Sequence, residues 1–245
     1  MNNSILKTSF FLFAILATVS CKDSGSQLVE SRIESRITSD SRTISVYLPD
    51  GYSKKETYPV VYVGDAVSFI SGDYCHILDS LTIHGIIRPV VVACTYNSKG
   101  VSASSNESFN IDYFADEFIP FVQSKYSVST DRADNLFFGI SQSADAGMKM
   151  SFDRPGLFSE YWCFSPLKTD VSSFLALDSP TSYKIVWVNK DELKVSFDYF
   201  PSMVNALKKR GASVKTKVLE TVPSTLVWRQ EFIRLLTDRF GIEEQ

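Results

Sequence analysis

One serine in this chain occupies a position from which it could act as a nucleophile. Residues 135–138 form an apolar run typical of a buried strand, and residues 144–148 are in helical register. Ser141 falls on the turn between them, in the sequence Gly-Ile-Ser-Gln-Ser. Such a turn exposes a serine hydroxyl at the edge of a sheet, and the free N–H groups of the following helix can stabilise an oxyanion. We therefore predict that Ser141 holds a nucleophile position, with Ser143 where the usual Gly-x-Ser-x-Gly pattern has its second glycine.

Groups that could activate this serine, or support other chemistry, are scarce. The chain has only two histidines, His76 and His84. It has no Cys-x-x-Cys or His-rich spacing for a structural zinc ion, and the sequence predicts neither a metal nor an organic cofactor. Residues 165–168 fit the pattern Ser-x-x-Lys, which we attribute to chance because its partner motifs are missing. Cys94 and Cys163 lie in apolar strand-like runs and are predicted to be core residues.

The elements that must position the serine alternate between strands and helices. Continuous β-branched runs at residues 58–63 and 89–94 are typical of strands buried on both faces of a mostly parallel sheet. Further strands are predicted at 43–48, 135–138, 161–164, 183–188 and 214–219. Helices are predicted at 111–126, with a kink at Pro120, and at 201–210. A final helix is predicted around the apolar stripe of Trp228, Phe232, Leu235 and Leu236. This alternation predicts one α/β domain with helices on both faces of its sheet.

Length, composition and charge exclude several classes of protein. The 245 residues are 44% hydrophobic and 22% charged, which is ordinary for a globular protein and argues against a disordered chain or a disulfide scaffold. The formal net charge is -3, and the longest basic cluster is residues 208–210. A nucleic-acid partner is therefore not expected.

The N-terminal residues have the pattern of a segment that is removed during export. Lys7 precedes a short apolar run at residues 10–19, which is too short to span a bilayer. The sequence Thr-Val-Ser-Cys that ends at Cys21 resembles the lipobox of bacterial lipoproteins. We predict a signal peptide over 1–20, a lipidated Cys21 with a tether over 21–30, and a domain over 31–245, lipid-anchored in the bacterial cell envelope and facing the periplasm or the cell surface. The alternative is a plain secretory signal with an incidental cysteine.

Several segments, taken in order, resemble one family over most of the chain after the signal peptide. They are residues 45–52 (SVYLPDGY), 58–66 (YPVVYVGDA), 77–92, 118–128 and 154–158 (RPGLF), together with the turn at Ser141. They are similar to the putative esterase family of α/β-hydrolases, which includes esterase D and the ferric-enterobactin, feruloyl and acetyl-xylan esterases. The resemblance implies an α/β-hydrolase fold and hydrolysis of a carboxylic ester without a cofactor.

The resemblance also assigns roles to individual residues. It implies that Ser141 is the nucleophile and that the oxyanion hole combines the N–H of Gln142 with one from the loop that contains Asp65 and Ala66. The acid of the catalytic triad should follow the strand at 183–188, which indicates Asp191 or, as the near alternative, Glu192.

The histidine of the triad has no counterpart at its expected place. In the family it follows the last strand in a Gly-Gly-His segment, and here that segment offers Val222, Pro223 and Ser224. His84 resembles a surface residue, and His76 could reach the serine only from the wrong side of the site. A serine without a base is a poor nucleophile.

Two functions follow from this pattern. The first is an envelope esterase that is impaired or inactive. The second is a non-catalytic pseudo-esterase that binds a small ligand, such as a siderophore or an acylated glycan, or a protein partner.

Overall fold

A nine-stranded sheet runs through the residues that the structure describes. The computed structural model describes residues 18–20, 25–96, 109–166, 181–188 and 194–242. The strands are β1 (Thr18–Ser20), β2 (Gln27–Ser35), β3 (Asp40–Leu48), β4 (Val60–Val63), β5 (Val91–Thr95), β6 (Asn135–Ile140), β7 (Glu160–Phe164), β8 (Ser182–Val188) and β9 (Ser213–Leu219), in the spatial order β1-β2-β3-β5-β4-β6-β7-β8-β9. The strands β1, β2 and β3 are antiparallel to their neighbours, whereas β4 to β9 are mutually parallel.

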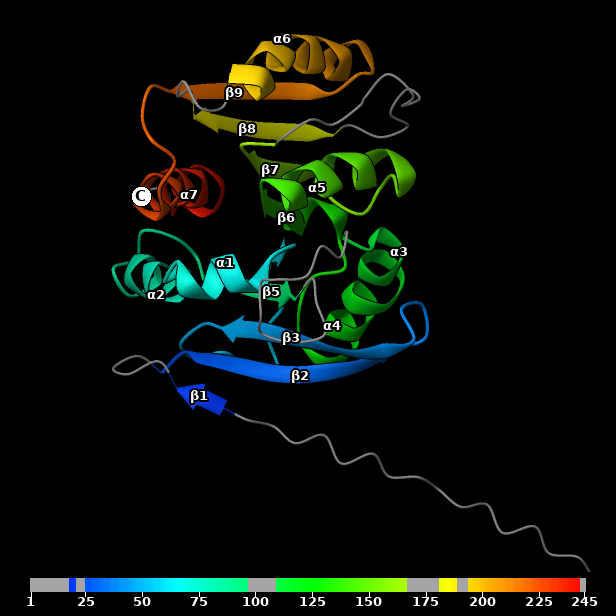
Figure 1. Ribbon diagram of the computed structural model, residues 1–245. Coiled ribbons are helices and arrows are strands. Elements are labelled where there is room, and N and C mark those ends of the chain that lie inside the picture. The colour runs from blue at the N-terminus through cyan, green and yellow to red at the C-terminus, as the bar shows by residue number, and fades with distance from the viewer. Residues whose placement is uncertain (1–17, 21–24, 97–108, 167–180, 189–193, 243–245) are drawn as a thin grey trace, which may run out of the picture.

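Helices cover both faces of this sheet (Figure 1). They are α1 (Ala66–Ser71), α2 (Tyr74–Ile83), α3 (Ile111–Tyr113), the π-helical turn η1 (Phe114–Phe118), α4 (Ile119–Lys125), the 3₁₀ turn η2 (Arg132–Asp134), α5 (Gln142–Asp153), α6 (Lys194–Lys209) and α7 (Thr225–Phe240). Figure 1 shows α1, α2 and α7 on one side of the sheet and α3, α4 and α5 on the other. This confirms the predicted α/β architecture.

Two apolar layers hold the sheet between the helices. Alternate residues of a strand point to opposite faces, so that Phe137 joins the core under α5 while Phe138 joins the core under α1, α2 and α7. All residues of β4 and β5 are buried, which confirms that both strands are covered on each face. Cys94 and Cys163 are fully buried, as predicted.

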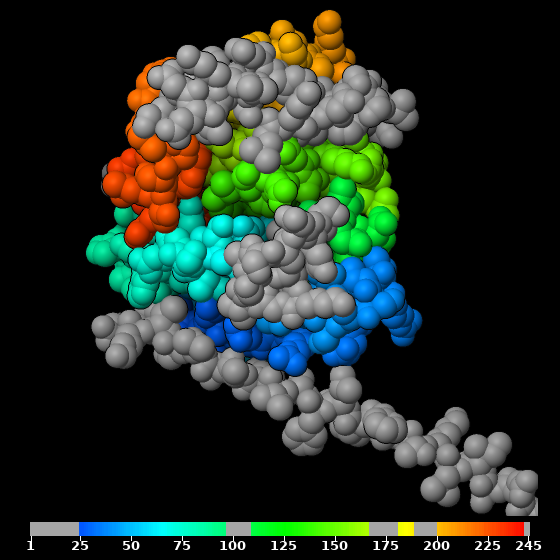
Figure 2. All heavy atoms as spheres, in the orientation of Figure 1, coloured from blue at the N-terminus to red at the C-terminus, as the bar shows by residue number. Residues whose placement is uncertain are grey.

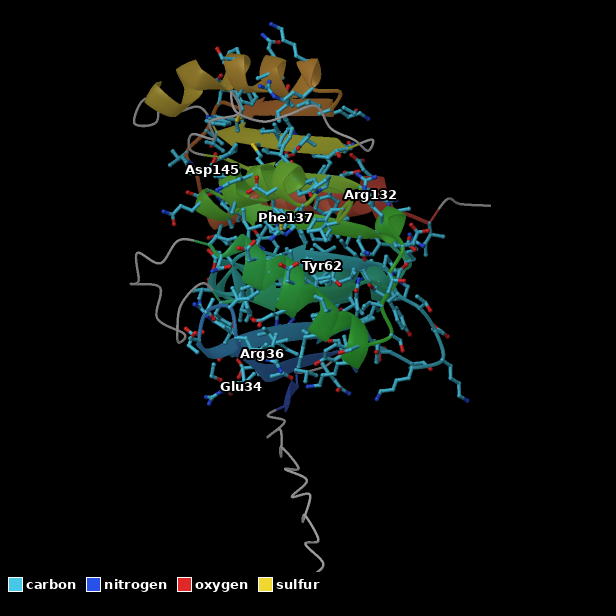
Figure 3. All side chains as sticks on the ribbon, turned by 90° about the vertical axis from the view of Figure 1, so that its right-hand side faces the viewer. Glu34, Arg36, Tyr62, Arg132, Phe137 and Asp145 are labelled. Carbon is cyan, nitrogen blue, oxygen red and sulfur yellow. The ribbon has the colours of Figure 1, made fainter. Side chains whose placement is uncertain are left out.

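The two edges of the parallel strands orient the molecule. Strands β4 to β9 all run in the same direction. The side of the sheet where these strands end is called the carboxyl edge, and the side where they begin is called the amino edge. Ser141 follows β6 and therefore lies at the carboxyl edge, where parallel α/β sheets place their sites. Figure 3 shows this polarity, because Asp145 of α5 and Arg132, which precedes β6, lie toward opposite sides of the molecule.

Two details differ from the sequence-based expectations. Strand β2 begins at Gln27, inside the tether predicted over 21–30, so that the ordered domain starts earlier than predicted. It was not predicted because two of its inward-facing residues are the serines Ser31 and Ser35, which hide the apolar alternation. Residues 18–20, inside the predicted signal peptide, pair with β2 as the short strand β1.

The helix predicted over 111–126 contains a π-helical turn just before Pro120. Pro120 stands at the start of α4 and has no N–H to donate, so the α-helical hydrogen bond to the carbonyl four residues earlier is missing. The π-helical turn η1 over Phe114–Phe118 takes the place of a simple kink. The helix predicted over 201–210 begins earlier, because α6 starts at Lys194 and Pro201 lies inside it. The predicted stripe of Trp228, Phe232, Leu235 and Leu236 lies within α7.

Candidate active site

Ser141 sits on a strained turn between β6 and α5. Its backbone has φ 57° and ψ −120°, a conformation that an L-residue adopts at a cost of about 1 kcal/mol or more. The turn is fixed on both sides, because Ser141 N–H donates to the carbonyl of Phe164 on β7 (2.9 Å) and Asp145 N–H donates to the carbonyl of Ser141 (3.1 Å). The Ser141 side chain remains partly exposed. The predicted strand–turn–helix arrangement is present.

Close packing of β6 against α5 holds this turn in place. A Cβ atom on Gly139 would lie 2.6 Å from the carbonyl carbon of Ser143 and 2.7 Å from the nitrogen of Ala144, so only glycine fits. A Cβ atom on Gly147 would meet the ring of Phe137 at 2.2 Å. The first turn of α5 can therefore approach the strand closely, and Ser141 is carried at its tip.

Ser143 fits the place of the usual second glycine. Its Oγ accepts from the N–H of Ile140 (2.9 Å) and donates to the carbonyl of the same residue (2.8 Å). Room for its Cβ comes from Gly64, where an added Cβ would lie 3.0 Å from the Cβ of Ser143. Ser143 therefore closes the turn with two hydrogen bonds that a glycine could not make.

The predicted oxyanion residues lie at the starts of two helices. Gln142 is the first residue of α5, and Ala66 is the first residue of α1. Their strands β6 and β4 are parallel neighbours, with Val63 beside Phe138, so the two helix starts meet at the carboxyl edge. In Figure 2 the cyan surface of α1 and the green surface of α5 adjoin on one face.

Hydrogen bonds in the α1 loop narrow the choice of oxyanion donors. Gly64 N–H already donates to the carbonyl of Phe138 (3.1 Å), which leaves Asp65 and Ala66 as the donors from this loop. The carboxylate of Asp65 caps α1, accepting from the N–H of Ser68 (3.2 Å) and from its hydroxyl (2.6 Å). The arrangement can supply one N–H from each of two helix N-termini to an anionic oxygen.

The predicted acid lies outside the described residues. Asp191 and Glu192 follow β8, whose last described residue, Val188, is buried at the carboxyl edge. Both residues stay predictions. The same holds for the lipidation site Cys21 and for Lys168 of the Ser-x-x-Lys pattern.

The place expected for the triad histidine holds an ordinary helix cap. Ser224 precedes α7 with extended backbone (φ −152°), and its Oγ accepts from the N–H of Val227 (3.3 Å). Val222 and Pro223 before it are exposed. No group in this described segment can take a proton from Ser141.

Both histidines lie on the surface of α2. His84 is exposed at the C-terminal end of that helix, where its Nδ1 lies 2.7 Å from the carbonyl of Ser80. The chain then enters β5 from the amino edge, opposite to Ser141. His76 has a side chain that is 57% exposed and lies 3.4 Å from Asp73, which also pairs with Arg229 of α7 (3.3 Å). No hydrogen bond among the described residues joins either histidine to Ser141.

A second serine, Ser165, was not predicted as a site residue. It follows β7 at the same edge, one strand from Ser141, and its φ of 41° is also in the left-handed region. Its N–H donates to Val186 (2.8 Å), but its buried Oγ has no hydrogen-bond partner in the described structure. Buried hydroxyls are rarely left without one. Its position directly after a buried strand, as for Ser141, was the signal that could have found it.

The described residues include no metal-binding cluster, and their cysteines are buried. No group of three or more His, Cys, Asp or Glu side chains able to hold a metal ion occurs in the described ranges. Burial raises the pKa of the Cys94 and Cys163 thiols, which makes them unreactive. Among the helices described, none is both long and apolar enough to span a bilayer.

The fold and the turn at Ser141 define the class of this protein. A mostly parallel sheet covered on both faces, with a serine on a strained strand-to-helix turn at its carboxyl edge, is the α/β-hydrolase fold. The model of the family described as "Putative esterase" matches residues 35–212, and the chain belongs to this family. The match ends before the segment at 220–229 in which the triad histidine is expected.

Solved structures of esterases share this fold. A ferulic acid esterase is 16% identical, with a TM-score of 0.75, and the alignment covers 89% of this chain and 99% of that one. An S-formylglutathione hydrolase from Agrobacterium tumefaciens is 14% identical, with a TM-score of 0.70 and coverage of 94% and 100%. A ferulic acid esterase from Anaeromyces mucronatus is 16% identical, with a TM-score of 0.69 and coverage of 96% and 94%. At these identities the likeness concerns the fold.

Proposed function

We propose that this protein is an envelope lipoprotein whose esterase-family domain binds an ester-bearing ligand at Ser141 and hydrolyses it very slowly or not at all. The ligand class is a carboxylic ester, such as a siderophore or an acylated glycan. The observation that carries the proposal is Ser224, a helix cap at the place expected for the triad histidine.

The remaining groups suit binding better than turnover. A serine hydroxyl attacks a carbonyl only when a base removes its proton, and loss of one triad member typically lowers turnover by several orders of magnitude. The N–H groups at Gln142 and in the α1 loop need no base in order to bind a carbonyl oxygen.

One observation favours the alternative, a slow but genuine esterase. The backbone strain at Ser141 is retained (φ 57°), and strained turns of this kind are found where a serine is presented for reaction. In that case another base must serve, with His76 as the first candidate.

A serine-directed probe separates the two functions. We expect the wild-type protein not to react with a fluorophosphonate and not to hydrolyse p-nitrophenyl acetate above the level of Ser141→Ala. Labelling that disappears in Ser141→Ala would show an activated serine and would overturn the pseudo-esterase proposal. Loss of that labelling in His76→Gln would then identify the base.

Restoring a base provides a second test. Ser224→His places an imidazole in the segment where the family has one, and we expect it to raise probe labelling above that of the matched variant Ser224→Ala. Both variants lose the same helix cap, so a difference between them reports the imidazole alone. If neither gains labelling, the missing histidine is not what silences Ser141.

The lipid anchor has its own test. Palmitate fed to expressing bacteria should appear in the wild-type protein and not in Cys21→Ser, and only the wild-type protein should sediment with membranes. If the wild-type protein is released without lipid, the N-terminal segment is a plain secretory signal.

A further inference from the structure

Three isoleucines form an exposed apolar cluster at the amino edge of the sheet. Ile83, Ile86 and Ile242 are 59%, 42% and 56% exposed, and we call them the isoleucine patch. Backbone hydrogen bonds bring their segments together, because Ile242 N–H donates to the carbonyl of Ile86 (3.2 Å) and Ile86 N–H donates to the carbonyl of Leu81 in the last turn of α2 (2.9 Å). Single exposed apolar side chains are normal, but three of them on neighbouring segments make a candidate contact surface.

The N-terminal segment enters the domain at this same edge. Gln27, the first residue of β2, pairs with Leu48 at the end of β3, and the neighbouring Tyr47 pairs with Val92 near the start of β5. Adjacent strands lie about 4.8 Å apart, so Gln27 is about 10 Å from the start of β5, which follows the isoleucine patch in the chain. Glu34 and Arg36, at the other end of β2, lie on the side of Asp145 in Figure 3.

The reach of the chain ties a lipid on Cys21 to this edge. Cys21 precedes Gly25 by four residues, and an extended chain spans at most about 3.6 Å per residue, or about 14 Å in total. A lipid on Cys21 therefore holds the amino edge, and not the carboxyl edge, close to the membrane.

We propose that the isoleucine patch rests on the surface of the membrane in which Cys21 is anchored, so that the candidate site at Ser141 faces away from the lipid. The inference builds on the lipid anchor of the proposed function. Ser141 lies at the far end of β6, a strand of six residues, and this separates it from the amino edge by about 20 Å. The ligand would therefore arrive from the aqueous side.

The contact is apolar in character. Arg88 is paired with Asp134 (3.5 Å), and Arg239, three residues before Ile242, donates to the carbonyl of Ala133. Glu243 and Glu244 follow Ile242 in the sequence. We therefore do not expect attraction to anionic lipid headgroups to hold the isoleucine patch at the membrane. A lipid tether keeps the patch close to the membrane, so that even a weak contact forms readily. Three isoleucines can then set the orientation of the domain relative to the membrane.

The test uses the mature lipidated protein, which begins at Cys21, in phosphatidylcholine vesicles. A fluorophore is attached to a cysteine introduced by Ile86→Cys or, as the matched control, by Leu226→Cys. Leu226 is 64% exposed at the start of α7, the end opposite to Ile242, and the native thiols Cys75, Cys94 and Cys163 are buried. Quenching by nitroxide-labelled lipid and by aqueous iodide is then measured for both positions.

We expect lipid quenching to be several-fold stronger at position 86 than at position 226, and to be unchanged by added salt. Adding Ile83→Asn and Ile242→Asn should abolish it at position 86 while palmitate stays on Cys21. Equal quenching at both positions of a lipidated protein overturns the docking proposal and leaves the anchor standing.

Two other outcomes also overturn the proposal. Shielding of position 86 from iodide without lipid quenching would show that a second copy of the chain covers the patch. A wild-type protein without lipid on Cys21 would overturn the anchor, and the docking proposal with it.

Discussion

Two strand-to-helix turns at the carboxyl edge have opposite characters. Between β6 and α5, a buried strand leads into Ser141, whose backbone is strained and whose side chain makes no capping hydrogen bond to its helix. Between β9 and α7, a largely exposed strand leads into Ser224, whose backbone is relaxed and whose side chain caps its helix in the usual way. In the family, the first turn carries the nucleophile and the second the base.

The difference shows that packing in the core fixes the geometry of the first turn but not that of the second. The turn at Ser141 is fixed by glycines that let α5 lie against Phe137 and by hydrogen bonds to β7, so it cannot relax without disturbing the core. The segment at 220–226 is exposed, and a residue there can change without any effect on packing. A second turn without a histidine is therefore compatible with the strained geometry of the first.

The largest expected effect tests how firmly the first turn is held. Gly139→Ala should lower the free energy of unfolding by about 3 kcal/mol, because the new methyl group meets backbone atoms that cannot move aside. Chemical denaturation measures the change. The control is Gly156→Ala, where φ is 93° but no atom lies within 4 Å, with an expected cost of about 1 kcal/mol. Similar losses of unfolding free energy in both variants would show that close packing does not stabilise the turn.

The second prediction concerns Ser143. Ser143→Ala removes two hydrogen bonds to Ile140 and should cost about 1 kcal/mol, and Ser143→Gly should cost about 2 kcal/mol because glycine is also unfavourable in a helix. Urea unfolding of both variants measures this. If Ser143→Gly is instead more stable than the wild-type protein, Ser143 destabilises the turn.

The third prediction concerns Glu231 of α7, which pairs with Lys217 of β9 and with Arg234 of its own helix. Burial raises the pKa of Glu231, but hydrogen bonds from Lys217 and Arg234 outweigh burial, and the pKa is lowered overall. A lowered pKa stabilises the fold above the ordinary glutamate pKa of about 4.3, and this stability is lost as the pH falls through the folded pKa.

Glu231→Gln should therefore cost about 1 kcal/mol at pH 7, because Lys217 and Arg234 are about 40% exposed and water weakens their attraction to the carboxylate. It should cost little near pH 3. Thermal unfolding across this pH range measures the difference. Asp238→Asn, which removes an exposed pair with Arg234 (2.9 Å), is the control and should change stability by less than about 0.5 kcal/mol. A loss from Glu231→Gln that does not depend on pH would contradict this account.

The smallest expected effect belongs to the second turn. Ser224→Ala removes one long capping hydrogen bond from an exposed helix start and should cost about 0.5 kcal/mol. Fluorophosphonate labelling and ester hydrolysis should not change. A change in either would show that Ser224 takes part in chemistry and would break the contrast between the two turns.

Much of the fold was predictable because its strands are buried on both faces. Runs such as residues 58–63 and 89–94 leave little choice but a covered parallel strand, and the buried cysteines were predicted for the same reason. Strand β2 escaped prediction because Ser31 and Ser35 face inward, and the π-helical turn before Pro120 depends on packing that no local pattern reports.

The candidate site was predictable only in part. Ser141 was found because strand, turn and helix are contiguous in sequence. Ser165 was not, because its relation to Ser141 arises from the pairing of β6 with β7, and its unpartnered hydroxyl is a property of the folded chain. The acid at Asp191 or Glu192 stays a prediction.

The buried cysteines have a consequence for how unfolding can be observed. Cys75 and Cys94 lie in the core layer under α1, α2 and α7, whereas Cys163 lies in the layer under α5. Each thiol becomes accessible to an alkylating reagent only when its own layer separates from the sheet. The mass added at each cysteine over time would therefore record which side of the sheet opens first, without any label being introduced into the protein.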